Sequence, residues 1–152
     1  MLCLLQRVTQ ASVSVNGATI AAIEAGLLVL VGVERGDTPI QAERMAERLL
    51  SYRVFEDAAG KMNLSLAQTA GALLLVPQFT LAANTAQGKR PSFAPAAPPD
   101  VAVALFDELL RCTRERHTSV ASGQFGAHMQ VALINDGPVT FLLRVAAQQE
   151  MP

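Results

Sequence analysis

The N-terminal part of the chain consists of short apolar runs separated by turn residues. Residues 2–8, 11–15 and 18–24 are rich in aliphatic and β-branched residues, and the hairpin dipeptide Asn16-Gly17 separates the last two runs. Residues 26–33 (GLLVLVGV) are apolar throughout, which is the pattern of a strand covered on both faces. This part of the chain therefore predicts a series of strands.

Two segments have the apolar periodicity of helices. The first has Thr38 as its N-cap and Pro39 at its first position, and Gln41 completes a capping box. Its apolar stripe consists of Ala42, Met45, Ala46, Leu49 and Leu50. The second runs from about residue 99 to 116 and ends in a cluster of basic residues, which the helix dipole favours. These are the two main helices that the sequence predicts.

The segments around the helices predict further strands and two loops. Residues 52–55 and 72–76 are short apolar runs, whereas residues 56–64 are polar and contain glycine, which indicates a loop. Residues 82–99 are rich in proline and have little periodicity, which favours a long ordered loop. Two final apolar runs flank the four residues 135–138. This order of elements predicts a mixed α/β fold with many antiparallel strand pairs.

Composition adds limits to this fold. The chain has 152 residues, of which 51% are hydrophobic and 16% charged, enough for one full core, so we expect a single domain over residues 1–152. The sequence has no run of about 18 apolar residues and no secretory signal pattern, which predicts a cytoplasmic protein. Cys3 and Cys112 are too few for a disulfide framework, and we expect buried free thiols. A formal net charge of -1 provides no broad basic surface for duplex nucleic acid.

The common catalytic motifs are absent from the sequence. The two histidines, His117 and His128, do not stand at HExxH or HxxxH spacing, so we predict no metal site. The sequence has no P-loop, no GxGxxG and no GxSxG segment, which removes the commonest nucleotide, dinucleotide and esterase sites. We therefore expect an activity without a cofactor.

Two short polar stretches remain as candidates for a site. Gln78, Phe79 and Thr80 place an amide, an aromatic ring and a hydroxyl directly after a buried strand, where open α/β sheets often build their sites. The other stretch is NDGPVT at residues 135–140, in which Gly137 permits a positive φ and Pro138 fixes φ near about -65°. Taken alone, the first stretch is better explained as a strand end and the second as a hairpin turn.

Taken together, the two stretches resemble the motifs of the D-aminoacyl-tRNA deacylases, which hydrolyse the ester between a D-amino acid and the 3′ end of tRNA. The family motifs SQFTL and NxGPVT correspond to PQFTL at residues 77–81 and NDGPVT at residues 135–140. The segments LLQRVTQASVSV, GLLVLVGV, YRVFEDAAGKMNLS, GKRPSF and MQVALINDGPVTFLL also resemble family segments, in family order and over nearly the whole length. Pro77 replaces the usual serine of the family, so any role of that hydroxyl is absent here.

The resemblance implies a barrel-like deacylase fold and a homodimer that binds the 3′ end of tRNA, without a cofactor and without a DNA or membrane partner. It also implies that Gly137 and Pro138 of one subunit, joined by a cis peptide bond, enter the site of the other subunit as a chiral filter. Carbonyl groups there would hold the substrate's amino group and leave no room for an L side chain, so glycine would also be accepted. The same resemblance assigns Arg7 and Asn135 to the support of this filter.

The resemblance assigns the chemistry to Gln78, Phe79 and Thr80, and leaves two mechanisms open. Thr80 can be a nucleophile only beside a base, and the sequence shows none. In the favoured mechanism, backbone N–H groups around Phe79 and Thr80 stabilise the oxyanion, and the ribose 2′-OH of tRNA helps to activate water. Lys61, Lys89 and Arg90 lie in the two polar loops, where they either meet the acceptor end or are solvated charges.

Two other classes of function also remain open. A non-catalytic RNA-binding module would bind tRNA regardless of the chirality of its amino acid, although one Tyr, six Phe and no Trp make a weak stacking platform. A structural oligomer with a hairpin turn at NDGPVT would lose only stability when Gly137 or Pro138 is replaced.

Overall fold

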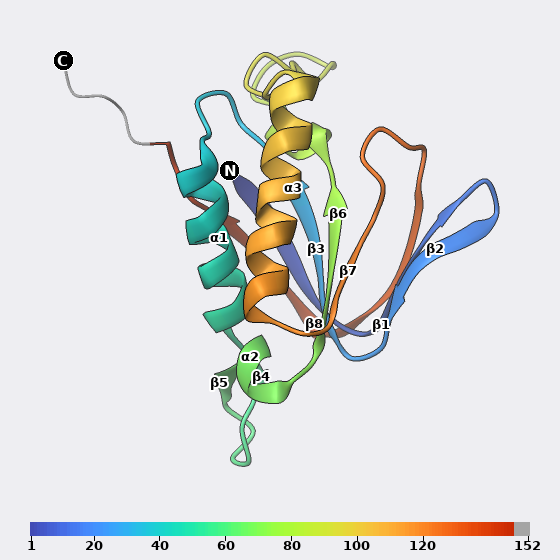
Figure 1. The fold of residues 1–152 in the computed structure, drawn as a ribbon, viewed down its shortest axis with the longest axis vertical. Helices are drawn as coiled ribbons and strands as arrows, with labels where there is room; N and C mark the ends of the chain where they lie inside the picture. The colour runs from blue at the N-terminus through green and yellow to red at the C-terminus, as the bar shows by residue number, and fades with distance from the viewer. Residues whose placement is uncertain (148–152) are drawn as a thin grey trace.

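The computed structural model describes residues 1–147 (Figure 1). The elements of this part follow one another as β1 (Leu2–Val15), β2 (Ala18–Ile23), β3 (Gly26–Gly32), α1 (Pro39–Ser51), β4 (Arg53–Glu56), β5 (Met62–Ser65), α2 (Leu66–Thr69), β6 (Ala72–Pro77), the 3-10 helix η1 (Phe79–Ala82), α3 (Pro99–Arg116), β7 (Val120–Ser122) and β8 (Gln130–Arg144).

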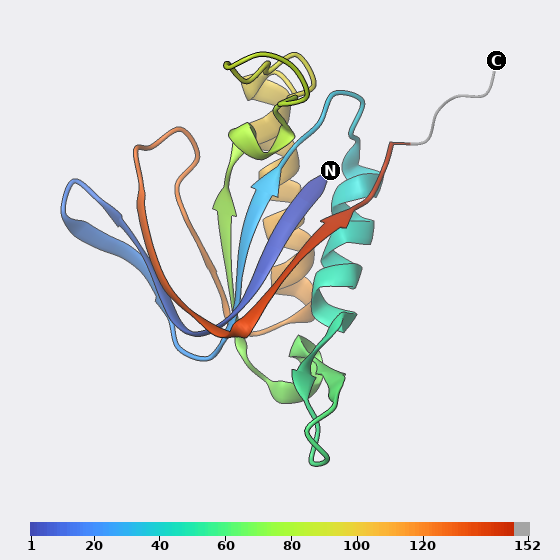
Figure 2. The ribbon, with the colours of Figure 1, turned by 180° about the vertical axis from the view of Figure 1, so that it is seen from behind.

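A curved, mixed sheet forms the main layer. Its strand order is β2-β1-β3-β6-β7, and β8 lies along the other edge of β1. β1 is antiparallel to β2, β3 and β8, whereas β6 is parallel to β3 and β7. α1 and α3 lie side by side over one face of the sheet, and the β1–β2 hairpin curls away from them (Figures 1 and 2). The predicted mixed α/β fold with a barrel-like sheet and two main helices is confirmed.

The curvature of the sheet produces two apolar cores. The core between the sheet and the helices includes the fully buried residues Leu5, Leu27, Val29, Met45, Leu49, Leu73, Leu75 and Leu109. The core inside the curve includes Val8, Val13, Leu28, Leu74 and Val76. Neighbouring residues of β3 and β6 point into opposite cores, because side chains alternate along a strand. Burial of each such side chain contributes about 1.5–3 kcal/mol, so these two strands are the best-anchored part of the sheet.

The two predicted helices are present. The side chain of Thr38 accepts from the backbone N–H of Ile40, and the Thr38 N–H donates to Gln41 Oε1 at 2.8 Å, which is the predicted capping box. The second helix, α3, spans Pro99–Arg116 and has Arg114 and Arg116 in its last turn. Both helices are specified by local sequence signals, which explains why their positions could be predicted.

Two strand predictions and one loop prediction were wrong in detail. Residues 2–15 form one strand, because β1 bends at register shifts without losing its partners. Residues 62–65 pair with β4 as β5, although their polar composition indicates a loop. Residues 130–144 form one strand instead of two, because both halves pair with β1 and not with each other. The short elements α2, η1 and β7 were not predicted from the sequence either.

Cys3 and Cys112 are buried free thiols, as predicted. Burial raises the pKa of the Cys3 thiol, and burial together with the nearby Glu108 carboxylate raises the pKa of Cys112. Both thiols therefore stay protonated near neutral pH. No helix within residues 1–147 is long and apolar enough to cross a lipid bilayer.

A buried ion pair joins the ends of β1, β3 and β8. The α-amino group of Met1 donates to Asp37 Oδ1 at 2.7 Å, to Glu34 Oε2 at 3.1 Å and to the carbonyl of Val145 at 2.8 Å. The other carboxylate oxygen of Asp37 accepts from the backbone N–H of Glu34 at 2.7 Å. This network fixes the turn that follows β3 at the end of the molecule where η1 lies (Figure 1).

Candidate active site

Gln78, Phe79 and Thr80 lie at the carboxyl end of the parallel strands β3 and β6. The backbone N–H of Gln78 donates to the carbonyl of Val31 at 2.7 Å, and η1 begins at the next residue. The side-chain Nε2 of Gln78 donates to Oγ1 of Thr80. The three residues, which we call the Gln78–Thr80 turn, therefore stand at the end of a buried strand, as the sequence predicts.

Close packing of η1 on β3 depends on Gly32. A Cβ at this position would lie 3.1 Å from the Cβ of Leu81 and 3.4 Å from the carbonyl oxygen of Gln78, so a larger residue would push η1 outward. In its present position η1 leaves Phe79 56% exposed. That ring packs against Phe93 with 5.2 Å between centroids.

Pro77, which stands where the family has serine, fits the end of β6. In this strand the N–H of Leu73 donates to the carbonyl of Ser119, just before β7, whereas the N–H of Gln78 donates to the carbonyl of Val31 in β3. The backbone N of residue 77 faces the β7 side of the strand, as that of Leu73 does. β7 ends at Ser122, which pairs with Leu75, so no strand lies opposite residue 77 there. The N–H group that proline lacks is therefore not needed by the ladder.

A cleft of about 280 Å³ opens beside η1. It is lined by Val76, Pro77, Gln78, Phe79, Phe125, Gly126, Ala127, His128, Met129 and Val131. Its walls are mainly apolar, and His128 is the one ionisable residue among those that line it. Within residues 1–147, no group of three or more His, Cys, Asp and Glu side chains is arranged to hold a metal ion. This site is suited to binding and positioning a substrate.

Residues 135–140 form a corner within β8 rather than a hairpin turn. Gly137 has a φ of 141°, and the peptide bond between Gly137 and Pro138 is cis. The pairing of β8 with β1 continues on both sides, but its register shifts between Gln6 and Val8. Because Asp136, Gly137 and Pro138 are exposed, the corner projects from the sheet.

Arg7 and Asn135 contact this corner directly. The buried Arg7 donates from Nε to the carbonyl of Asp136 at 3.0 Å and from Nη1 to the carbonyl of Val54 at 2.8 Å. Its Nε also lies 3.6 Å from the Asp136 carboxylate. Asn135 accepts from the Val139 N–H at 2.8 Å and donates to Thr140 Oγ1 at 2.7 Å. The corner is thus held on both sides by side-chain hydrogen bonds.

Within one chain the corner and the Gln78–Thr80 turn are far apart. Arg7, beside the corner, pairs with Leu27 of β3, which pairs with Leu73 of β6. Gln78 lies five residues beyond Leu73, or roughly 16 Å along the strand, and β1 and β3 separate β8 from β6 by roughly 14 Å more. Figure 2 shows η1 near the top and the bend of β8 well below it, at the other end of the strands. The two candidate stretches do not form one site in a single chain.

Some residues at the turn were missed by sequence reasoning. Phe93 lies within GKRPSF, which we noted only as a family segment, and the cleft residues Phe125 and Met129 carry no catalytic group that draws attention. Gly32 belongs to an apolar strand, where nothing marks its contact with η1. Their proximity follows from pairing between distant segments, which periodicity does not show.

Comparison with known proteins gives consistent matches. The family model described as D-Tyr-tRNA(Tyr) deacylase matches residues 4–144. The D-aminoacyl-tRNA deacylase of Methylococcus capsulatus is 64% identical over 144 residues, which cover 95% of this chain and 94% of the relative. That of Janthinobacterium sp. is 63% identical over 145 residues, which cover 95% and 97%.

Solved structures show the same fold. A structure of the c-Myc DNA Unwinding Element Binding Protein has a TM-score of 0.93 and 39% identity, and covers 97% of this chain and 100% of its own. A structure of a probable eukaryotic D-amino acid tRNA deacylase has a TM-score of 0.79 and 20% identity, and covers 93% and 97%. On the match over residues 4–144 and the identity to these relatives, the chain belongs to the D-aminoacyl-tRNA deacylase family.

Proposed function

We propose that the protein removes D-amino acids from tRNA in the cytoplasm as a homodimer, and that Gly137 and Pro138 of one subunit read chirality in the site of the other. Ester hydrolysis of D-aminoacyl-tRNA is the activity of its 61–64% identical relatives, as their name states. The observation that carries the finer proposal is the exposed, rigidly held corner, which cannot reach Gln78–Thr80 of its own chain.

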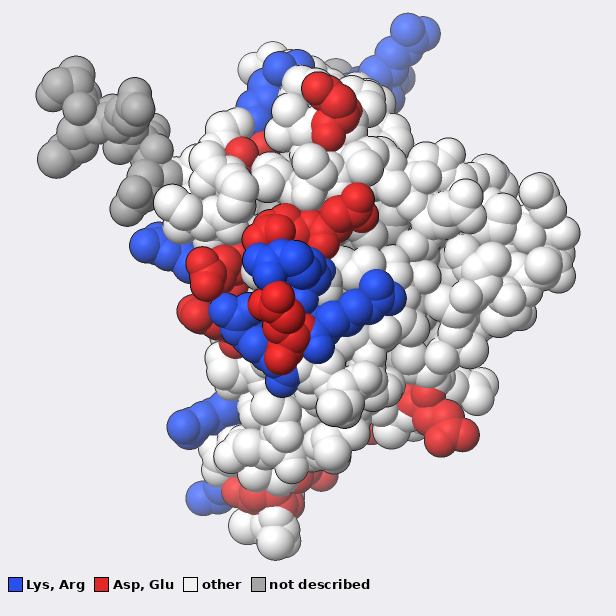
Figure 3. All heavy atoms as spheres, viewed as in Figure 1, with Lys and Arg blue, Asp and Glu red and all other residues white. Residues whose placement is uncertain are grey.

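A surface without charged residues supports the dimer. Between Arg7 and Glu24, and again between Arg116 and Asp136, the sequence contains no Lys, Arg, Asp or Glu. These segments form β2, β7, the second half of β1 and the first part of β8, and this side of the molecule is white in Figure 3. Depletion of charge is typical of the centre of a protein interface.

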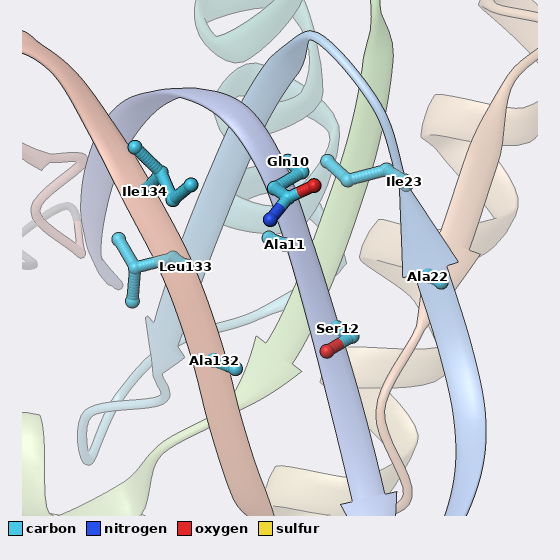
Figure 4. A pocket seen from close by; sticks show the side chains of 8 residues that line it. All are labelled: Gln10, Ala11, Ser12, Ala22, Ile23, Ala132, Leu133 and Ile134. Atoms are coloured by element: carbon cyan, nitrogen blue, oxygen red, sulfur yellow. The ribbon is translucent and has the colours of Figure 1, made fainter.

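A shallow groove on this surface adds to the argument. It measures about 370 Å³ and is lined by Gln10, Ala11, Ser12, Ala22, Ile23, Ala132, Leu133 and Ile134, from β1, β2 and β8 (Figure 4). Ile134 is 52% exposed there, one residue before the Asn135–Thr140 corner. A second copy that covers this groove would therefore come close to the corner.

The proposed filter acts through backbone atoms. Arg7 holds the Asp136 carbonyl at 3.0 Å, and Asn135 holds the Val139 N–H at 2.8 Å, so the peptide groups between them have one orientation. Carbonyl groups fixed in this way can accept from the substrate's ammonium group in a single pose. An L side chain would then collide with the corner, whereas a D side chain or the hydrogen of glycine would not.

The proposed chemistry at the turn is positioning and oxyanion stabilisation. The N–H groups of Phe79 and Thr80 are the first two of η1, and the first N–H groups of a helix have no acceptor within it. Loss of one oxyanion donor typically lowers kcat by about 10² to 10³. The Thr80 hydroxyl already accepts from Gln78 Nε2, and within residues 1–147 no carboxylate or imidazole forms a hydrogen bond with it. This supports water activated by the 2′-OH over Thr80 as the nucleophile.

The first test is substrate chirality. Purified protein is incubated with D-Tyr-tRNA, L-Tyr-tRNA and Gly-tRNA, and ester loss is followed against uncatalysed hydrolysis. We expect hydrolysis of the D-tyrosyl and glycyl esters only. Equal hydrolysis of the L-tyrosyl ester would contradict the filter, and binding of all three tRNAs without hydrolysis would favour the RNA-binding module.

The second test is complementation between subunits. Gly137→Ala impairs the filter, and Thr80→Pro removes a backbone N–H at the turn. Each variant alone should lose about 10²-fold or more in kcat, whereas mixed dimers contain one site with an intact turn and an intact corner. Recovery of activity on mixing is therefore expected. No recovery, with subunit exchange shown by native mass spectrometry, would contradict a site shared between subunits.

A further inference from the structure

We infer that Lys89 and Arg90, at the tip of the loop between η1 and α3 (residues 83–98, the η1–α3 loop), bind phosphate groups of the tRNA acceptor strand near its 3′ end. The inference rests on the proposed function, since it assigns the neighbouring surface a part of the same substrate.

Hydrogen bonds hold the η1–α3 loop in a defined conformation. Asn84 and Ser92 form a backbone bridge, with N–H to carbonyl distances of 2.8 and 3.0 Å. The Asn84 side chain accepts from the N–H of Ala86 at 3.0 Å, which turns the chain toward the tip. At the base, the N–H of Arg35 donates to the Pro95 carbonyl at 2.9 Å. The tip is therefore presented at a defined place.

The tip is close to the Gln78–Thr80 turn. The Phe93 ring packs on Phe79 at 5.2 Å, which joins the loop to η1. Arg90 is three residues from Phe93 in sequence, so their Cα atoms are at most roughly 11 Å apart. For scale, each strand of double-stranded DNA carries a phosphate about every 3.4 Å of helix axis, so a distance of this size corresponds to a few nucleotides. An acceptor strand whose terminal ester lies at Thr80 can therefore pass the tip within its last few nucleotides.

The local charge is positive although the whole chain is slightly acidic. Between Asp57 and Asp100 the only charged residues are Lys61, Lys89 and Arg90. Figure 3 shows blue side chains at this end of the molecule, with red ones between them. Glu34, at the base of the loop, is already paired with the Met1 amino group and, at 2.9 Å, with the guanidinium of Arg144. Two exposed cations without a neighbouring acid in their loop suit an anionic strand.

Lys61 does not share this position. It follows the Gly60 turn of the β4–β5 hairpin, which lies at the opposite end of the molecule from the η1–α3 loop (Figures 1 and 2). The structure thus separates three basic residues that the sequence grouped together, and it leaves two of them beside the candidate site.

The test compares two double variants that remove equal positive charge. Lys89→Ala/Arg90→Ala removes the tip charges, and Arg44→Ala/Arg114→Ala removes two exposed charges from α1 and α3. Steady-state kinetics are measured with D-Tyr-tRNA and with 3′-O-D-tyrosyl adenosine, which lacks the acceptor strand. Binding of deacylated tRNA is measured by fluorescence anisotropy as a function of salt.

We expect the tip variant to raise KM for D-Tyr-tRNA several-fold at unchanged kcat, and to leave the adenosine ester unaffected. The slope of log affinity against log salt should fall by about 0.7 for each lost phosphate contact. The Arg44/Arg114 variant should match the wild type. An unchanged KM and salt slope, or equal impairment on the adenosine ester, would overturn the inference. A wild type that binds tRNA through the tip but hydrolyses neither ester would refute the proposed function and support the binding surface.

Discussion

The Gln78–Thr80 turn and the Gly137–Pro138 corner are held in different ways. The turn is fixed by backbone hydrogen bonds, two within η1 and one from the Gln78 N–H to the Val31 carbonyl of β3, and Phe79 is largely exposed. The corner is fixed by the buried side chain of Arg7, which also holds the Val54 carbonyl of another strand. Side chains at the turn should therefore tolerate change better than the corner and its supports.

The largest expected effect concerns the buried ion pair between the Met1 amino group and Asp37, at the same end of the molecule as the Gln78–Thr80 turn. Asp37→Asn leaves the Met1 amino group with only Glu34 as a carboxylate partner, and removing one partner of a buried pair costs about 3–5 kcal/mol. We expect a loss at the lower end of this range in urea unfolding. Because none of the backbone hydrogen bonds that fix the Gln78–Thr80 turn involves Asp37, kcat of the folded protein should change little. A large fall in kcat with unchanged stability would contradict this view.

The next largest effect is expected for Gly137→Ala. A Cβ there would lie 2.6 Å from Cγ2 and 2.9 Å from the N atom of Val139, at a φ of 141° that side chains rarely adopt. The corner must shift, and a displacement of about 1 Å in a site can lower activity about 10²-fold. We expect this loss in kcat/KM for D-Tyr-tRNA.

The matched control is Gly60→Ala, because Gly60 also has a positive φ but no atom within 4 Å of its added Cβ. It should lose some stability and keep its activity. Equal losses of activity in both variants would show that backbone strain alone, without the corner's shape, explains the effect.

A smaller effect is expected for Arg7→Lys. Lysine keeps the charge but lacks the planar guanidinium with which Arg7 donates to the carbonyls of both Asp136 and Val54. Leaving one buried acceptor unpaired costs about 1–3 kcal/mol of stability. If Arg7 positions the corner, the ratio of kcat/KM for D-Tyr-tRNA over L-Tyr-tRNA should also fall. An unchanged ratio with reduced stability would make Arg7 purely structural.

The smallest effect is expected for Thr80→Ala. It removes the hydroxyl that accepts from Gln78 but keeps the backbone N–H. Under the positioning mechanism kcat should fall less than about tenfold, below the usual loss of one oxyanion donor. If Thr80→Ala abolished turnover without affecting tRNA binding, and a 2′-deoxy terminus were still hydrolysed, Thr80 would be the nucleophile.

The sequence predicted what local signals specify and missed what distant pairing decides. The Thr38 capping box and the periodicity of residues 99–116 were sufficient for the helices. NDGPVT, by contrast, has every local feature of a hairpin turn, yet β1 pairs with both of its flanks and makes it a corner. The contact of Arg7 with Asp136 joins residues 129 positions apart, and only the family resemblance pointed to it.

The separation of the corner from the turn has a consequence for how the protein behaves on dilution. If each complete site needs parts of two chains, a monomer carries a turn and a corner but has no complete site. Loss of partners at low concentration would then reduce the number of working sites by mass action. The remaining sites would discriminate as well as before, so dilution would make the protein slower without making it less accurate.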